Sequence, residues 1–239
     1  MDFVITTFCN INCKNCCALM PYYKRPFHYP LEEIKKNLKK LSDCEMVRNI
    51  QIIGGETLLH PDINKIIEYV STLDFDVISI YTNCTIIPEG FEEILKHMDS
   101  RFCMCLTEYG EKSKCFDELI ELCEIHNVQY EINGFGNIMG ASKGKEWLKT
   151  GNPDIKPFPK ISYDTCGQIM TCMGNKIFRC TRIAHLSNIV DLQLDEDEYF
   201  NIDELTNEKY EQFKEVKFTK NCNRCLRGTS LCTNIPKGS

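Results

Sequence analysis

The stretch IQIIGGETLLHPDINKIIEYVSTLDFDVISIYTN, residues 50–83, contains the pattern that decides the fold. It opens with a short apolar run at 50–53 and closes with a similar run at 77–81. Between these runs, four apolar residues recur at the spacing of one helical face: Ile63, Ile66, Ile67 and Val70. A strand, an amphipathic helix and a second strand in this order predict a β/α/β unit with parallel strands.

The same unit recurs on both sides of this stretch. Further strand-like runs lie at 3–5, 102–106 and 128–132. Markers in four successive runs are 27, 26 and 25 residues apart, which is the length of one β/α unit: Ile50, Val77, Cys103 and Val128. Helical stripes fall at 31–41, 63–70, 91–98 and 116–123. We therefore expect an α/β fold around a parallel sheet, open or closed, with its active site at the carboxyl ends of the strands.

Net charge and cysteine content limit the classes of partner and site that the chain can have. The 239-residue chain carries 28 Lys and Arg against 34 Asp and Glu, a formal net charge of −6, so we expect no nucleic-acid partner. The amino end, MDFVITTFCN, lacks the features of a secretory signal, and no apolar run reaches the roughly 18 residues of a membrane span. We expect no membrane partner and a cytoplasmic location, where the 16 cysteines stay reduced and indicate metal or redox sites.

Cys9, Cys13 and Cys16 form a C-x3-C-x2-C triplet shortly after the first apolar run. Three thiolates can hold a [4Fe–4S] cube and leave its fourth iron open for a ligand. The same residues are compatible with a zinc site that borrows a fourth ligand, or with ordinary thiols in a loop. The spacing alone leaves these three alternatives open.

One β/α unit later, the second predicted strand runs into Gly54, Gly55 and Glu56. Glycines let a ligand approach the backbone closely, and a carboxylate suits a ligand ammonium group. In this position after a C-x3-C-x2-C triplet, the run GGETLLHPD at 54–62 resembles the radical S-adenosylmethionine (radical SAM) superfamily.

The resemblance implies a partial (β/α) TIM-like barrel of five or six parallel strands, with the sixth strand missing or near 155–161. It implies that the triplet holds a [4Fe–4S] cluster whose open iron binds SAM, and that the Gly-Gly-Glu segment borders the methionyl amino group. It also implies SAM contacts at the ends of the third and fourth strands, from Thr82, Asn83, Thr107 and Glu108. Two positions depart from the family pattern: Asn15 replaces a common aromatic residue, and Cys84 replaces a glycine.

The last third of the chain holds six more cysteines: Cys166, Cys172, Cys180, Cys222, Cys225 and Cys232. The pair Gly174-Asn175 lies between two strand-like runs and predicts a hairpin. A hairpin followed by a C-x2-C pair suits a zinc ribbon. Beside a radical SAM core, however, it resembles the auxiliary-cluster domain called SPASM, or its shorter form, twitch.

This second resemblance implies a radical SAM core at 1–150 and a β-hairpin plus helix domain at 151–239. It implies an auxiliary [4Fe–4S] cluster held by four of the cysteines: Cys166, Cys180, Cys222 and Cys225. Cys172 is the first substitute if one of these is not a ligand, and a role for Cys232 stays open.

A cluster with four cysteine ligands has no open iron and suits electron transfer. Together with SAM chemistry, this favours oxidation or epimerisation of a small hydroxylated molecule, a sugar or cyclitol, with Arg182 and His185 as candidate catalytic residues. A flavodoxin or ferredoxin is the expected electron donor. The alternatives are a maturase that crosslinks a ribosomally made peptide and, in another class, a non-catalytic iron–sulfur or zinc-binding protein.

Overall fold

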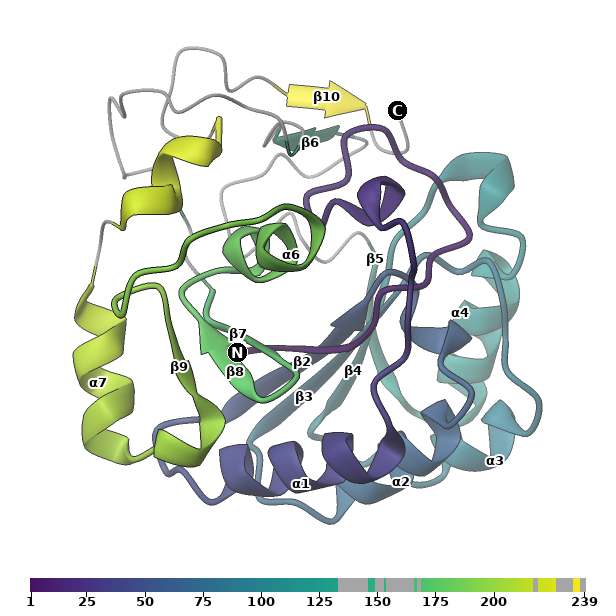
Figure 1. Ribbon diagram of the computed structural model, residues 1–239. Helices are drawn as coiled ribbons and strands as arrows, with labels where there is room; N and C mark the ends of the chain where they lie inside the picture. The colour runs from purple at the N-terminus through teal and green to yellow at the C-terminus, as the bar shows by residue number, and fades with distance from the viewer. Residues whose placement is uncertain are drawn as a thin grey trace. The chain divides into compact units, whose positions relative to one another are not determined.

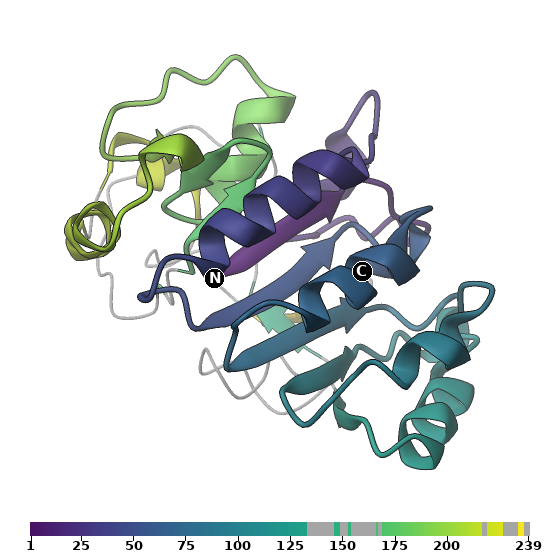
Figure 2. The same cartoon turned by 90° about the horizontal axis from the view of Figure 1, so that it is seen from below.

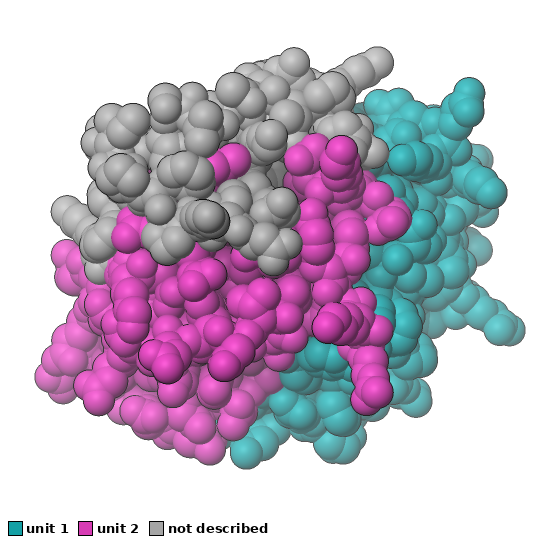
Figure 3. All heavy atoms as spheres, turned by 45° about the horizontal axis from the view of Figure 1, so that its top comes forward, with its two compact units in different colours: residues 1–11, 26–134 teal, residues 12–25, 135–239 magenta. Residues whose placement is uncertain are grey.

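The computed structural model describes residues 1–132, 146–148, 153, 166, 169–216, 219–226 and 234–236. The chain divides into two compact units, which Figure 3 distinguishes by colour. The first unit comprises residues 1–11 and 26–134, and the second unit comprises residues 12–25 and 135–239. The segment 12–25 therefore belongs with the carboxyl-terminal part of the chain, which no sequence pattern indicates. The domain boundary predicted at residue 150, the sixth strand sought near 155–161 and Cys232 lie outside the described residues.

Five parallel strands form the sheet of the first unit, in the order β5-β4-β3-β2-β1 (Figure 1). Their bounds are Asp2–Thr6 for β1, Asn49–Gly54 for β2, Val77–Thr82 for β3, Phe102–Leu106 for β4 and Gln129–Ile132 for β5. Each predicted strand is present, and the predicted α/β class with a parallel sheet is confirmed.

Helices cover one face of this sheet (Figure 2). They are α1 (Leu31–Ser42), α2 (Ile63–Ser71), α3 (Phe91–Leu95) and α4 (Phe116–Ile125). Because side chains alternate between the faces of a strand, every second residue packs against the helices. In β2 and β3 the alternation is clear, since Ile50, Ile52 and Ile78 are fully buried while Gln51 and Ser79 are half-buried. The sheet therefore has one apolar, helix-covered face and one face with polar side chains.

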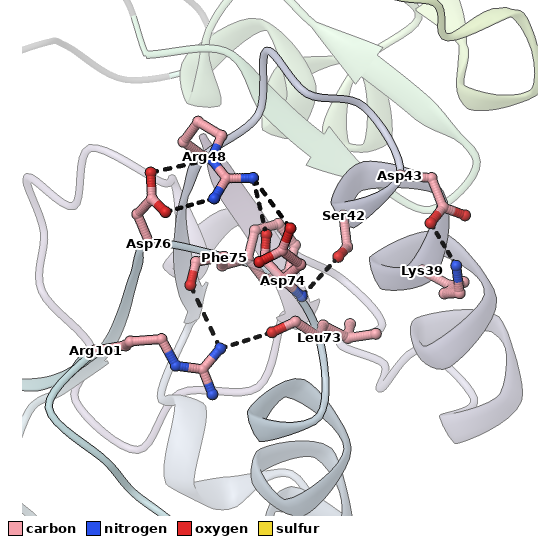
Figure 4. Close-up of polar contacts among 9 residues, drawn as sticks. All are labelled: Lys39, Ser42, Asp43, Arg48, Leu73, Asp74, Phe75, Asp76 and Arg101. Atoms are coloured by element: carbon pink, nitrogen blue, oxygen red, sulfur yellow. Dashed lines mark hydrogen bonds and ion pairs between the residues drawn. The ribbon is translucent and has the colours of Figure 1, made fainter.

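Charged residues gather at the amino ends of the strands (Figure 4). Arg48, just before β2, donates from Nε to Asp76 Oδ2 at 3.0 Å and pairs with Asp74 at 3.4 Å. Arg101, just before β4, donates from Nη1 to the Leu73 carbonyl at 2.7 Å. Exposed ion pairs of this kind contribute about 0–1 kcal/mol each. The Arg48 and Arg101 contacts stabilise the amino edge of the sheet. The opposite, carboxyl edge is where barrel enzymes carry their active sites.

In the second unit, β7 (Thr171–Met173) and β8 (Lys176–Phe178) form an antiparallel hairpin, and β9 (Tyr199–Asn201) pairs with β8. The hairpin confirms the prediction, and Gly174 supplies the turn with a φ of +59°. Two helices follow, α6 (Thr181–Ile189) and α7 (Asn207–Glu215), and the short strands β6 (Glu146–Leu148) and β10 (Asn234–Pro236) pair with each other. No helix among the described residues is long and apolar enough to cross a membrane.

Candidate active site

The carboxyl end of β2 is pressed against the backbone that leads into the cysteine triplet. Gly55 N donates to the Thr6 carbonyl at 3.0 Å, and Glu56 N donates to the Phe8 carbonyl at 2.7 Å. A Cβ on Gly55 would lie 2.2 Å from the Phe8 carbonyl oxygen and 2.8 Å from Cys9 Cβ. Only a glycine fits this position, and its fit sets where Cys9 lies relative to the edge of the sheet.

The Glu56 carboxylate joins the end of β2 to the end of β3. It is 1% exposed and accepts hydrogen bonds from Leu58 N at 2.9 Å, Thr82 Oγ1 at 2.8 Å and Asn83 N at 2.6 Å. Burial raises the pKa of this carboxyl to about 7, and the three hydrogen bonds oppose that rise. Through this carboxylate, Glu56 fixes Thr82 and Asn83, two of the predicted SAM contacts; its own contact with the methionyl ammonium stays a prediction.

Asn83 lies next to Cys9. Its Nδ2 group is 3.8 Å from Cys9 Sγ and donates to Asn10 Oδ1 at 3.1 Å. Thr85 completes a small network, because its Oγ1 lies 2.6 Å from Asn83 Oδ1 and 2.7 Å from Asn10 Nδ2. Hydrogen bonds to a ligating sulfur orient it and tune the metal centre. The sequence identified Asn83 but not Asn10 or Thr85, since no local pattern links these positions.

Cys84 adopts a left-handed backbone with a φ of +57° and is fully buried. This conformation favours glycine, which explains why the related pattern has glycine at this position. The Cys84 backbone N donates to Thr82 Oγ1 at 3.0 Å, so the turn is held in spite of the side chain. The departure from the family pattern thus leaves the shape of this turn intact.

Thr107 and Glu108 follow β4 at the same edge of the sheet. Thr107 N donates to the Thr82 carbonyl at 2.9 Å, so the chain continues beside the end of β3. Thr107 is half-buried and Glu108 is exposed. The structure brings both residues to the edge where the sequence expects them, and their contact with SAM stays a prediction.

The cysteine triplet lies where the chain passes from the first unit to the second. Cys9 belongs to the first unit, and Cys13 and Cys16 belong to the second unit, where Cys16 N donates to the Cys13 carbonyl at 3.1 Å. Among the described residues, no three His, Cys, Asp or Glu side chains already form a group that could hold a metal ion. The donor chemistry fits a [4Fe–4S] cluster, since iron–sulfur clusters take cysteine thiolates, and the cradle at Gly55 holds the Cys9 segment in place. The ligand set remains a proposal.

The four predicted auxiliary cysteines all belong to the second unit. Cys180 caps the amino end of α6, where Ile183 N donates to its Sγ at 3.5 Å. Burial raises the pKa of the Cys180 thiol to about 12, and Cys225, Cys222 and Cys166 act in the same direction. Cysteine thiolates have the donor chemistry of an iron–sulfur cluster, and this set of four ligands stays a prediction.

Cys172, the first substitute ligand, is fully buried in β7 and donates from Sγ to the Gly174 carbonyl at 3.7 Å. That contact places its thiol at the hairpin turn. A role for Cys172 as a substitute ligand stays a prediction.

The candidate catalytic residues, Arg182 and His185, are buried on α6, with exposures of 7% and 0%. Arg182 Nε donates to the Arg224 carbonyl at 2.8 Å, and His185 Nδ1 lies 2.7 Å from Tyr23 Oη. Burial lowers the pKa of His185 to about 3, so the ring is neutral at pH 7. Both side chains join parts of the second unit, and a contact with substrate stays a prediction. The sequence missed Tyr23 as a partner because its contact spans 162 residues.

Comparisons with known proteins identify the family of the chain. A model described as the Radical SAM superfamily matches residues 3–135, more than half of the 239-residue chain. The antilisterial bacteriocin subtilosin biosynthesis protein AlbA of Bacillus subtilis (strain 168) is 32% identical over 94 residues, covering 39% of this chain and 20% of that protein. The chain thus spans about a fifth of the length of this relative.

Two solved structures also match. Native anSMEcpe with bound AdoMet has a TM-score of 0.40 and 17% identity, and the match covers 55% of this chain and 43% of that chain. Native anSMEcpe with bound AdoMet and Cp18Cys peptide has a TM-score of 0.41 and 19% identity, over 55% of this chain and 42% of that one.

Proposed function

The chain belongs to the radical SAM superfamily, whose members use a [4Fe–4S] cluster and S-adenosylmethionine, and on this premise we propose that it is an enzyme that modifies a peptide. The observation that carries this choice of substrate is the 32% identity to AlbA, a bacteriocin biosynthesis protein, over 94 residues. The sugar or cyclitol favoured by sequence reasoning has no support from the comparisons. A peptide therefore replaces it as the proposed substrate.

Cys9, Cys13 and Cys16 would hold the SAM-binding cluster. When bound, the cluster and SAM supply reductive cleavage to a 5′-deoxyadenosyl radical, which abstracts hydrogen from an unactivated carbon. The chain's own part is to position these groups. Gly55 keeps the Cys9 segment against the edge of the sheet, and Asn83 places an amide 3.8 Å from the Cys9 sulfur.

The face of the first unit's sheet opposite its helices is the proposed surface for the peptide. It carries side chains that donate and accept hydrogen bonds, among them Gln51, Ser79 and Tyr81, and these are half-buried rather than enclosed. Strand register puts Ser79 beside the half-buried Cys103, so this face continues from β3 to β4. Such a surface suits the amides of a peptide better than an apolar ligand.

Cys166, Cys180, Cys222 and Cys225 would hold an auxiliary [4Fe–4S] cluster, which would supply a one-electron acceptor. A crosslink within a peptide removes two hydrogens in total, one as a hydrogen atom and one as a proton plus an electron. The electron needs an acceptor, which is the reason for proposing that the second unit is redox-active. A flavodoxin or ferredoxin in a reducing cytoplasm is the proposed source of electrons for SAM cleavage.

The test is production of 5′-deoxyadenosine by anaerobically reconstituted protein with SAM and dithionite, measured by mass spectrometry. We would compare a library of synthetic cysteine-containing peptides with myo-inositol and glucose. The proposal predicts that a peptide raises 5′-deoxyadenosine production and loses the mass of two hydrogens. Stimulation by a cyclitol or sugar instead would refute the peptide assignment. Absence of SAM binding by a cluster-loaded protein would favour a non-catalytic carrier.

A further inference from the structure

The stretch from Phe3 to Pro30 differs in charge from the rest of the chain. It contains three basic residues, Lys14, Lys24 and Arg25, and no Asp or Glu. The other 25 Lys and Arg residues stand against all 34 Asp and Glu residues. In a chain of net charge −6, a stretch with only positive charges indicates a surface for an anionic partner.

The three basic residues lie in the loop that carries the proposed ligands of the SAM-binding cluster. Thr7 N donates to the Phe27 carbonyl at 2.9 Å, and Phe27 N donates to Thr7 Oγ1 at 2.8 Å. These two hydrogen bonds close residues 8–26 into a loop, which we call the cationic loop. All three cysteines of the triplet belong to it.

Tight turns keep the middle of the cationic loop compact. Cys16 N donates to the Cys13 carbonyl at 3.1 Å, Leu19 N donates to the Cys16 carbonyl at 3.0 Å, and Tyr22 N donates to the Leu19 carbonyl at 3.0 Å. The side chains of Leu19 and Met20 are buried. Backbone hydrogen bonds and apolar side chains therefore hold the loop, and its shape does not require the three cations.

The charges of Lys14, Lys24 and Arg25 are available to another protein. All three residues are exposed, and none of them forms an ion pair within the part of the chain that the structure describes. Other exposed lysines do form such pairs, as Lys65 does with Asp62 at 2.8 Å. A cation without a carboxylate partner gives up no existing ion pair when it meets an anionic surface.

The place of these cations favours an electron carrier as the anionic partner. Reductive cleavage of SAM needs one electron at the cluster, and electron transfer requires the donor to come close to the acceptor. Lys14 lies between Cys13 and Cys16 in the chain, so its Cα is within about 8 Å of theirs. Flavodoxins and ferredoxins are small acidic carriers of one electron. The peptide, in contrast, is proposed to bind the sheet of the first unit.

We propose that Lys14, Lys24 and Arg25 form the docking surface for an acidic one-electron carrier, a flavodoxin or ferredoxin, that reduces the SAM-binding cluster. One electron leaves the reduced carrier and enters the cluster, and no covalent bond forms or breaks in this step. The inference rests on the proposed function, because it needs the cluster of the cysteine triplet. Charge complementarity raises association rates by about 10- to 1,000-fold, and salt screens this effect.

The test measures binding directly, by isothermal titration calorimetry of the anaerobically reconstituted protein with an oxidised flavodoxin and, separately, an oxidised ferredoxin. A synthetic poly-glutamate peptide is the third titrant. Each titration is done at about 0.01 M and about 0.15 M salt, where the Debye lengths are about 30 Å and 8 Å. In parallel, 5′-deoxyadenosine production is measured with dithionite and with each reduced carrier.

Three triple variants are compared with wild type. The first removes the charges (Lys14→Gln, Lys24→Gln and Arg25→Gln), and the second keeps them (Lys14→Arg, Lys24→Arg and Arg25→Lys). The third is the matched control, which removes three charges from other exposed positions (Lys65→Gln, Lys96→Gln and Lys214→Gln).

At low salt, the inference predicts that the charge-removing variant binds a carrier at least about tenfold more weakly than wild type, with a smaller difference at higher salt. Its 5′-deoxyadenosine production should fall with that carrier and stay at the wild-type level with dithionite. The charge-keeping variant and the matched control should behave like wild type.

Equal carrier affinity in wild type and the charge-removing variant would overturn the inference, as would an equal loss in the matched control. Binding of the poly-glutamate peptide but of neither carrier would also overturn it. If wild type produces no 5′-deoxyadenosine even with dithionite, the proposed function is wrong, and the titrations still show whether these residues bind a carrier.

Discussion

Replacing Gly55 with Ala tests the geometry of the proposed SAM-cluster site most directly. The new Cβ would lie 2.2 Å from the Phe8 carbonyl oxygen, and real Cβ atoms essentially never approach closer than 3.0 Å. The Phe8–Cys9 segment must therefore move by about 0.8 Å, the difference between these distances. Because the obstacle is backbone, no side-chain rotation relieves the clash.

The displacement should lower the free energy of unfolding and should also impair cluster binding. Overpacking costs about 1–3 kcal/mol, and weakening the hydrogen bond from Glu56 N to the Phe8 carbonyl adds about 1 kcal/mol. We expect a loss of about 2–4 kcal/mol in the free energy of unfolding. Metal–ligand distances vary by only about 0.2 Å, so the shift of Cys9 should also prevent the protein from holding the SAM-binding cluster.

The assay combines urea unfolding with iron analysis of the reconstituted protein. Iron should fall from about eight to about four atoms per chain, as expected when one of two [4Fe–4S] clusters is lost. Gly90→Ala is the control, since its Cβ would meet only Asn64 Nδ2 at 3.7 Å and its φ of +71° costs about 1–2 kcal/mol. The control should lose stability but keep its iron. Full iron content and SAM cleavage in Gly55→Ala would refute the reasoning.

Three further predictions concern single side chains. The folded-state pKa of Glu56, about 7, lies above the usual 4.5, so Glu56 favours the folded state below pH 4.5 and this contribution is lost as pH rises through 7. Glu56→Gln should therefore reduce the decrease in the free energy of unfolding between pH 4.5 and 7, measured by urea unfolding. A pH profile equal to that of wild type would contradict this prediction. Tyr23→Phe should cost about 1–3 kcal/mol by removing the hydroxyl beside buried His185 Nδ1, whereas an unfolding midpoint equal to wild type would mean that the contact is weak. Cys13→Ala should abolish 5′-deoxyadenosine production while the iron of the proposed auxiliary cluster remains. If production persists, Cys13 is not a ligand of the SAM-binding cluster.

The sequence located the elements of the site because their signals are local. The run from Ile50 to Gly55 shows strand alternation followed by two glycines within a few residues, and the structure has β2 there. The turn at Gly174 is similarly local, because one left-handed residue suffices to reverse the chain. Patterns of this length predict which residues stand at a strand end or in a turn.

Other features depend on contacts between distant parts of the chain. Arg182 and His185 look available for substrate in the sequence, yet both are buried and bound to residues 42 and 162 positions away. Whether a polar side chain faces solvent or another segment depends on how the second unit packs, which the residues around Cys180 do not encode.

The sequence by itself determined the β/α order, the glycine pair at the end of β2 and the positions of the seven candidate cysteine ligands, because strand and helix periodicity are properties of short segments. Only the tertiary structure decided that Glu56 binds Thr82 and Asn83, that Asn83 reaches Cys9 and that His185 lies against Tyr23. Pairing register and packing bring these groups together, and both depend on the whole chain rather than on any one segment.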